Sequence, residues 1–213
     1  MNSLLKIPYV SAPENGCALA CYTMIAKYFF PETTFEQIAA ISQWKKSYVV
    51  WGFSFWLWLM NKNISVTDYD LIDYESWSKK GIEGLKTSVS NKTFDYLEKN
   101  TYDLTLLTEQ IKQCMNNEMF IYHRQKTTYT LLEKEIAEGN PCEVVLNSHA
   151  LNKVSGFALH RVVVLDIAHG LVTFHDPQMT PRPHRKETIK DFCHAWLEAQ
   201  DEPELCIYRN IRK

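Results

Sequence analysis

Apolar residues follow two different periods along the chain, and each period predicts a kind of secondary structure. A spacing of three and four residues, typical of a helix that packs one face on a core, begins at Cys17 and stops at Pro31. Thr34 and Gln37 have the spacing of a capping box and predict the start of a second helix. The predicted helices cover residues 17–30, 34–41, 51–60, 94–99, 104–115, 129–138 and 189–197.

Short apolar runs bounded by turn residues predict the strands. The run over 159–167 is rich in β-branched residues and has few polar interruptions, so we expect a central strand covered on both faces. Gly170 marks a turn, and the residues after it return as the hairpin partner as far as Pro177. The predicted strands cover residues 64–69, 120–123, 142–147, 159–167 and 171–175, after an extended segment at 7–11 and a turn at 12–16.

This order of elements predicts one α+β domain over residues 1–213. The length is about 1.4 times that of an average domain, which leaves room for elaborations but makes two full domains cramped. The sequence contains no repeat, no low-complexity tract and no linker rich in serine and glycine. The stretch from about residue 68 to residue 118 is polar with helical islands, and we expect it to be a helical insertion.

Composition and charge narrow the class of protein. Hydrophobic residues make up 46% and charged residues 23% of the chain, which excludes a disordered, collagen-like or coiled-coil protein. Lysine plus arginine number 23 and aspartate plus glutamate 25, a formal charge of −2. Because this charge balance produces no positive electrostatic potential that would attract a nucleic-acid backbone, no nucleic-acid partner is expected. The glycine spacing in residues 81–87 also differs from that of a phosphate-binding loop.

The N-terminal segment and the cysteines indicate in which cellular compartment the protein is expected. The first residues, up to Gly16, contain no apolar run of signal-peptide length. The longest apolar run, residues 48–60, is shorter than the roughly 20 residues that span a bilayer, so no membrane span is expected. The six cysteines are expected to be reduced, because a chain of this length needs no disulfide to hold its core. We therefore expect a cytoplasmic protein, or one exported without a conventional signal peptide.

Cys17 is a candidate nucleophile. It lies just after a turn, at the first position of a predicted helix, where free backbone N–H groups and the positive end of the helix dipole stabilise an anion. That position favours the thiolate, which is the reactive form. Position alone also fits a small apolar residue at a helix start, because a free cysteine is more often simply part of a core.

His160 and Asp176 form a candidate pair. The predicted hairpin turn is centred near residue 168, which is also the midpoint of positions 160 and 176. The two residues are therefore expected to be cross-strand neighbours, with Cβ atoms about 5 Å apart, so that the carboxylate can hold one nitrogen of the imidazole. A cysteine before a helix, a histidine that opens a strand and an acid that closes its partner together suit thiol acyl transfer.

Several short motifs resemble those of papain-like cysteine peptidases, nearest the bacteriocin-processing peptidases of double-glycine leaders and their stand-alone bacterial relatives. The motifs are Ile7–Val10, Asn15–Cys21, Gly139–Pro141, His160–Asp166 and Phe174–Pro177, which lie in the two ends of the chain. The resemblance implies a papain-like fold with the first helix packed on an antiparallel sheet. It also implies Cys17 as nucleophile, His160 as general base and later acid, Asp176 as the residue that orients the imidazole, and a peptide or protein as substrate.

The sequence departs from this family at two places. The family usually has a glutamine six residues before the nucleophile, where it donates to the oxyanion, and this chain has Ser11. The common Cys-Gly-Pro is replaced by Cys17-Ala18-Leu19. Ser11 and Asn15 are the candidates for a replacement donor, and loss of one donor can cost on the order of a hundredfold in rate.

These features leave more than one function open. The first interpretation is a hydrolase that cleaves a peptide or isopeptide bond, or a peptidyl or acyl transferase that uses the same three residues. The second is a catalytically silent peptidase-like fold that binds a peptide or protein. A third is a lipid-binding surface built on the aromatic run at 51–60, although such a run is more often core. No metal or cofactor is expected, because the cysteines and histidines lack the paired spacing of zinc ligands.

Overall fold

Seven strands form one continuous sheet in the computed structural model, which describes residues 4–178, 180–200 and 203–211. The strand order is β2-β1-β7-β3-β4-β5-β6. Only the outer pair β1 and β2 is parallel among the pairings of the described residues. The strands are β1 (Ile64–Asp70), β2 (Phe120–Arg124), β3 (Cys142–Asn147), β4 (Leu159–Ala168), β5 (Leu171–Asp176), β6 (Arg182–Thr188) and β7 (Glu204–Asn210).

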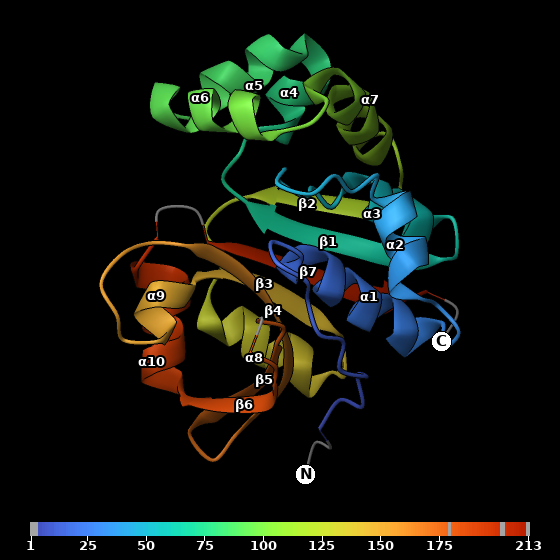
Figure 1. Cartoon of the computed structure of the whole chain (residues 1–213). Coiled ribbons are helices and arrows are strands. Elements are labelled where there is room, and N and C mark those ends of the chain that lie inside the picture. The colour runs from blue at the N-terminus through green and yellow to red at the C-terminus, as the bar shows by residue number, and fades with distance from the viewer. Residues whose placement is uncertain (1–3, 179, 201–202, 212–213) are drawn as a thin grey trace.

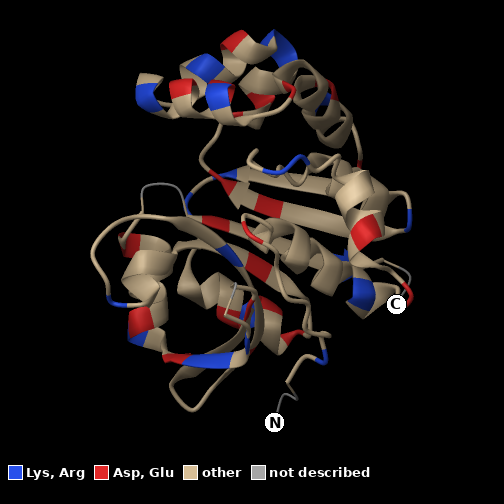
Figure 2. Cartoon of the chain, viewed as in Figure 1, with Lys and Arg blue, Asp and Glu red and all other residues tan. Residues whose placement is uncertain are grey.

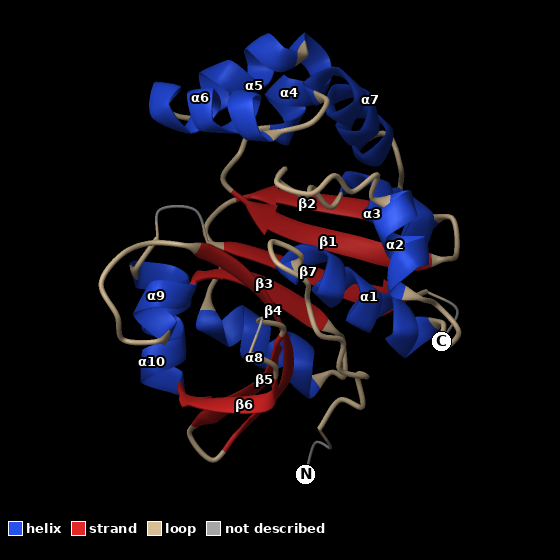
Figure 3. Cartoon of the chain, viewed as in Figure 1, coloured by secondary structure: helices blue, strands red, loops and turns tan. Residues whose placement is uncertain are grey.

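Helices cover both faces of this sheet, and a further group of helices lies beyond one of its edges (Figures 1 and 3). The first three helices lie on one face and α8 on the other, while α4 to α7 form a group beyond the β1–β2 edge. The helices are α1 (Cys17–Phe29), α2 (Phe35–Ile41), α3 (Phe53–Met60), α4 (Tyr74–Lys80), α5 (Ile82–Ser88), α6 (Asn91–Asn100), α7 (Leu104–Met115), α8 (Tyr129–Ala137), α9 (Ser148–Leu151) and α10 (Ile189–Cys193), which continues as one π-helical turn over His194–Glu198.

The predicted first helix is confirmed as α1. Every residue from Leu19 to Ala26 is buried, so the helix lies deep in the core and packs against β4. A tight turn delivers the chain to its first residue: the Gly16 N–H donates to the Pro13 carbonyl at 2.9 Å. A Cβ on Gly16 would lie only 2.7 Å from the Pro13 ring, so this turn requires glycine.

The second and third predicted helices are also confirmed. Thr34 and Gln37 form the complete capping box of α2, with each side chain bonded to the backbone of the other residue. The aromatic run forms α3, whose Phe53, Phe55 and Trp56 are almost fully buried against the sheet and α7. This run is therefore core rather than a lipid-binding surface. No helix in the described part of the chain is long and apolar enough to cross a bilayer.

The helical group α4 to α7 lies where the sequence predicts an insertion from about residue 68 to 118. Its helices start only at Tyr74, because β1 continues to Asp70. Gly81 joins α4 to α5 with a positive φ of 64°, and a Cβ on Gly84 would lie 2.1 Å from the Ser76 carbonyl oxygen. These glycines therefore permit a sharp turn and a close helix crossing, and the segment is not a phosphate loop. Basic and acidic residues are interspersed over this group (Figure 2).

Candidate active site

The N-terminal segment lies against the β4–β5 hairpin and brings the two ends of the chain together. The Leu5 N–H donates to the carbonyl of Leu165 at 3.0 Å. The buried imidazole of His175 donates through Nε2 to the Ile7 carbonyl at 2.9 Å. The Tyr9 hydroxyl donates to the backbone carbonyl of Asp176 at 3.3 Å. These bonds fix the approach of the chain to α1, and thus the position of the α1 N-terminus relative to the hairpin.

Cys17 is the first residue of α1 and is half-buried. The first N–H groups of a helix have no partner inside the helix. Here the N-cap is Gly16, no side chain of the described residues caps the helix, and its first turn contains no acidic residue. The positive end of the α1 dipole is therefore left uncompensated beside the Cys17 sulfur, which favours an anion at this place.

His160 and Asp176 are in direct contact. His160 Nε2 donates to Asp176 Oδ1 at 2.8 Å, and both side chains are buried. The predicted direct pairing across the hairpin is wrong by two positions, because Ala168 pairs with Leu171 and a bulge next to Val164 moves the register back toward the predicted pairing by only one position. Continuing the observed register places residue 162 opposite Asp176. His160 is thus a diagonal neighbour on the same face, which is within reach of a histidine side chain.

Cys17 and the imidazole of His160 interact, because each of the two groups shifts the pKa of the other. Because Nε2 of that ring is bound to Asp176, Nδ1 is the atom left for the sulfur. Burial raises the pKa of Cys17, but the bond and charge of His160 and the backbone of Arg161 outweigh it, and the pKa is lowered overall. Burial acts against the charged form of His160, yet its bonds to Asp176 and Cys17 raise the pKa to about 9. The two groups therefore favour a thiolate beside an imidazolium.

The other five cysteines have the opposite electrostatics. Burial raises the pKa of each of their thiols, and nearby carboxylates add to the shift. Four are fully enclosed, and Cys193 is half-buried like Cys17. Of the six cysteines, all of which the structure describes, Cys17 is thus the one whose pKa is lowered. The sequence distinguishes Cys17 by its position at a helix start, but it does not reveal the raised pKa values of the other five thiols.

Asp176 is a buried carboxylate with three side-chain donors. Besides His160, Arg185 Nη1 donates to Oδ2 at 2.8 Å and Gln178 Nε2 donates to Oδ2 at 2.9 Å. Burial alone would raise the pKa of Asp176, but the bonds and charges of His160 and Arg185 lower it overall. The carboxylate therefore stays ionised and fixed. Sequence reasoning missed both Arg185 and Gln178, because no motif marks them.

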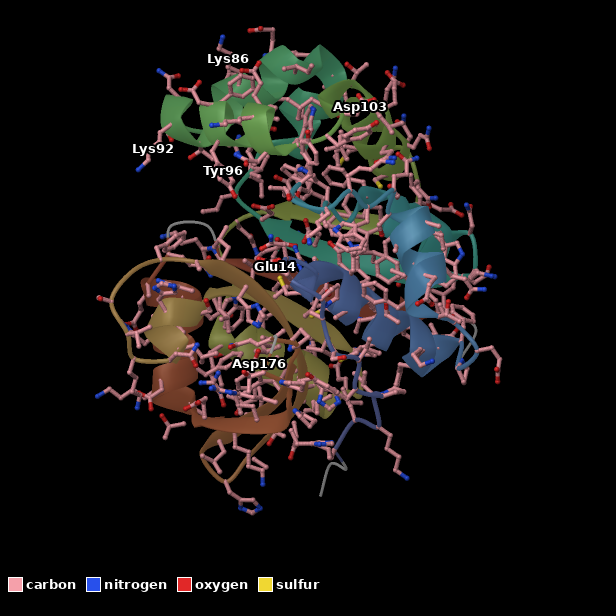
Figure 4. All side chains as sticks on the ribbon, in the orientation of Figure 1. Glu14, Lys86, Lys92, Tyr96, Asp103 and Asp176 are labelled. Atoms are coloured by element: carbon pink, nitrogen blue, oxygen red, sulfur yellow. The ribbon has the colours of Figure 1, made fainter. Side chains whose placement is uncertain are left out.

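The two candidate oxyanion donors lie in the segment before α1, Ser11 ahead of the turn and Asn15 within it, and both are exposed. Asn15 has a positive φ of 58°, a conformation that asparagine tolerates better than most residues. Its neighbour Glu14 lies 3.9 Å from Lys46 and so touches the loop before α3. In Figure 4 Glu14 lies between Tyr96 of the helical group and Asp176. The roles of Ser11 and Asn15 stay predictions.

One group of residues outside this site has the donor atoms of a metal site. Asp68, Glu204 and Cys206 each offer one atom, and the three atoms lie within 4.8 Å of one another. Arg161, however, donates to Glu204 at 2.8 Å and lies 3.9 Å from the Cys206 sulfur. A cation would therefore be repelled by a buried guanidinium. Burial raises the pKa of both Asp68 and Cys206. Raised pKa values favour the protonated side chains, which are poor metal ligands.

Arg161 is also the centre of a buried ionic network in the middle of the sheet. It donates to Glu143 at 2.9 Å as well as to Glu204, and its guanidinium lies over the Tyr22 ring. Glu143 receives a further bond from Tyr208 at 2.6 Å. Glu204 lies on β7 and Glu143 on β3, and Asp68 lies on the neighbouring strand β1. Figure 2 shows acidic positions on these strands. The network ties β3, β4 and β7 together directly beneath α1.

Comparison with known proteins identifies the architecture. No protein-family model and no curated protein sequence matches this chain. The fold is similar to that of the crystal structure of a double glycine motif protease from an AMS/PCAT transporter in complex with the leader peptide. The TM-score is 0.51 and the sequence identity 11%, over 99% of this chain and 96% of that chain. The predicted fold class is confirmed by this likeness: the chain has an α+β fold of the papain-like cysteine peptidase type.

Proposed function

We propose that this protein is a cysteine peptidase-like hydrolase that cleaves a peptide or isopeptide bond through a thioester on Cys17. The observation that carries the proposal is the buried His160–Asp176 hydrogen bond together with the electrostatic coupling of His160 to Cys17 at the start of α1. These interactions hold a sulfur of lowered pKa beside an imidazole of raised pKa at an uncapped helix N-terminus. These are the parts that covalent catalysis by a thiol needs.

In the proposed first half-reaction, the Cys17 thiolate attacks the carbonyl carbon of the scissile bond and forms a tetrahedral intermediate. The His160 imidazolium then donates its proton to the leaving nitrogen, the C–N bond breaks, and the acyl group remains on sulfur as a thioester. Neutral His160 next removes a proton from water, which attacks the thioester. The C–S bond breaks, the acid leaves, and the thiolate and imidazolium are restored.

The free N–H groups at the start of α1 support a site for the negative oxygen of the tetrahedral intermediate. The Cys17 N–H lies beside the reacting sulfur, and the helix dipole points its positive end there. We propose Ser11 or Asn15 as the second donor, in place of the family's glutamine. A carboxylate in the first turn would oppose an oxyanion, and the described first turn of α1 has none.

We propose a peptide or a protein segment as the substrate. Three apolar side chains in the loop before β4 and at its first residue, within six positions of His160 in the sequence, are more than half exposed: Val154, Phe157 and Leu159. Exposed apolar residues of this kind suit contact with apolar side chains of a bound peptide. The neighbour of similar fold was solved with a leader peptide. A transferase that passes the acyl group to an amine would use the same residues.

Selective alkylation separates an active site from a silent fold. At pH 6 we expect iodoacetamide to modify Cys17 at least about tenfold faster than any other cysteine, because an ordinary thiol is almost fully protonated there. Cys193 is the internal reference, since it is also half-buried but its pKa is raised. The measurement is the initial rate of modification of each cysteine-containing peptide by mass spectrometry.

The alternative is a peptide-binding protein without catalysis, which the replacement of the family's glutamine by Ser11 favours. In that case Cys17 would react at the same rate as Cys193 over the whole range from pH 6 to pH 8. Equal rates for the two thiols would contradict the proposed hydrolase.

A further inference from the structure

The second carboxylate oxygen of Asp176 is bound by Arg185, a residue of β6 that is not one of the three proposed catalytic residues. Arg185 Nη1 donates to Oδ2 at 2.8 Å, while Oδ1 accepts from His160 at 2.8 Å. The Arg185 side chain is only 9% exposed and that of Asp176 is fully buried. In so enclosed a place a guanidinium acts on its neighbours with little screening by solvent.

The guanidinium itself is held on every side. Glu187 Oε1 accepts from Nε at 2.9 Å and from Nη2 at 2.7 Å. Asn152 Oδ1 accepts from Nη1 at 3.0 Å, and the Leu151 carbonyl accepts from Nη2 at 3.1 Å. The Phe174 ring lies 5.7 Å from the guanidinium carbon. Arg185 is therefore a fixed point and not a mobile surface cation.

These partners join two segments that lead into the site. Leu151 ends α9, and Asn152 starts the loop that runs to Leu159 and His160. Asp176 ends β5 on the other side of the hairpin. Arg185 thus holds the carboxylate and the start of the histidine-bearing segment with one planar group, whose several N–H donors fix their relative position.

We propose that Arg185 is a positioning residue of this site: it fixes the Asp176 carboxylate for His160 and offsets part of its negative charge. This inference rests on the proposed function of Cys17, His160 and Asp176. With Arg185 present, the imidazole faces a carboxylate whose charge is partly neutralised. Glu187 in turn neutralises part of the charge of Arg185, so the two residues of β6 act on His160 in opposite directions.

The charged and titratable groups around Asp176 come from four elements. They are Tyr9 of the N-terminal segment, Cys17 and Cys21 of α1, His160 of β4, and Arg182, Arg185 and Glu187 of β6, of which Arg182 is the backbone pairing partner of Asp176 and has an exposed side chain. Arg185 is the permanent cation in direct contact with the carboxylate. Changing its charge, or that of Glu187, therefore changes the electrostatic potential at His160 with a sign that can be stated in advance.

The test is an NMR titration of the His160 imidazole in the full chain, which does not depend on a substrate. Arg185→Met leaves the carboxylate uncompensated, so we expect the pKa of His160 to rise by about one unit. Glu187→Gln keeps an oxygen that can accept the same hydrogen bonds but removes the negative charge that offsets Arg185. We therefore expect the pKa of His160 to fall by about half a unit. Shifts of opposite sign are not expected from simple loosening of the fold.

Arg182→Met is the matched control. Arg182 is exposed, lies on the same strand and donates to the same Asn152 oxygen at 3.1 Å, but the hydrogen bond that Arg185 makes to Asp176 is separate from it. We expect the wild-type His160 titration in this variant. An unchanged midpoint in Glu187→Gln, or a shift of the same sign in both Arg185→Met and Glu187→Gln, would overturn the proposal. Glu187→Gln decides the question even if Arg185→Met fails to fold.

Failure of this inference can be told apart from failure of the proposed function. If Cys17 is no more reactive than Cys193 in the wild-type protein, the hydrolase is wrong, and the inference fails with it. If Cys17 is selectively alkylated but Arg185→Met and Glu187→Gln both keep the wild-type pKa of His160, the proposed hydrolase stands and Arg185 has only a structural role.

Discussion

Replacing Cys17 by alanine should reduce hydrolysis of any peptide or isopeptide substrate by about four orders of magnitude or more, while the fold is kept. Alanine removes the sulfur that forms the thioester, and the remaining groups can only bind the substrate and polarise its carbonyl. The Cβ stays at the start of α1, so packing changes little. Turnover is measured by mass spectrometry on a panel of peptide and isopeptide substrates, with circular dichroism to verify the fold.

Cys193→Ala is the matched control, because it removes a thiol of similar exposure at the end of α10. We expect this variant to retain wild-type turnover. Hydrolysis that survives Cys17→Ala at the wild-type rate would end the assignment of the nucleophile.

Replacing Arg161 by methionine should lower the free energy of unfolding by about 3–5 kcal/mol, because it leaves two buried carboxylates without their cation. Glu143 is fully buried and Glu204 largely so, and both accept from this guanidinium. Methionine keeps most of the side-chain volume, so the loss comes from charge and hydrogen bonds more than from a cavity. Equilibrium unfolding in urea measures the change.

Arg124→Met tests whether the effect depends on burial. Arg124 pairs with Asp73 at 2.6 Å, but its side chain is 52% exposed. We expect a loss of at most about 1 kcal/mol, as for other surface ion pairs. If Arg161→Met cost no more than Arg124→Met, the buried network would not hold the central strands as described.

Local sequence signals were sufficient for most of the elements around the site. The helix that starts at Cys17 and stops before Pro31, the capping box at Thr34, and the hairpin that follows His160 are all confirmed. Each of these depends on a short-range cause: apolar spacing, side-chain capping or a glycine turn. The resemblance to papain-like peptidases, which rested on motifs at the two ends of the chain, agreed with the fold.

Elements whose residues pack by long-range contacts were missed. β7 lies between β1 and β3 in the middle of the sheet, but its sequence, Glu204–Asn210, starts and ends with polar residues. Its Glu204 and Cys206 face the buried ionic network, which no local pattern reveals. β6 is mostly exposed and rich in charge, so it shows no apolar alternation. The short helices α4, α5 and α9 were also not predicted.

The geometry of the candidate site was predicted only in part. The sequence predicts His160 and Asp176 on one hairpin, yet the observed pairing differs by two positions because the turn is centred between His169 and Gly170 and not near residue 168. The bulge next to Val164 moves the register one position back toward the predicted pairing. The sequence contains no sign of Arg185, which reaches Asp176 from a neighbouring strand. The contact between Cys17 and His160 depends on how α1 packs on β4, and tertiary packing of this kind has no local signal.

The central claim is that His160 holds Cys17 as a reactive thiolate, and one measurement tests it without a substrate. The rate of iodoacetamide modification of Cys17 at pH 6 is compared between the wild-type protein and His160→Ala, with Cys193 as the reference in each sample. We predict that Cys17 loses its advantage in the variant and reacts about as slowly as Cys193, because its pKa returns toward that of an ordinary thiol. A Cys17 that reacts as fast in His160→Ala as in the wild-type protein would contradict the account.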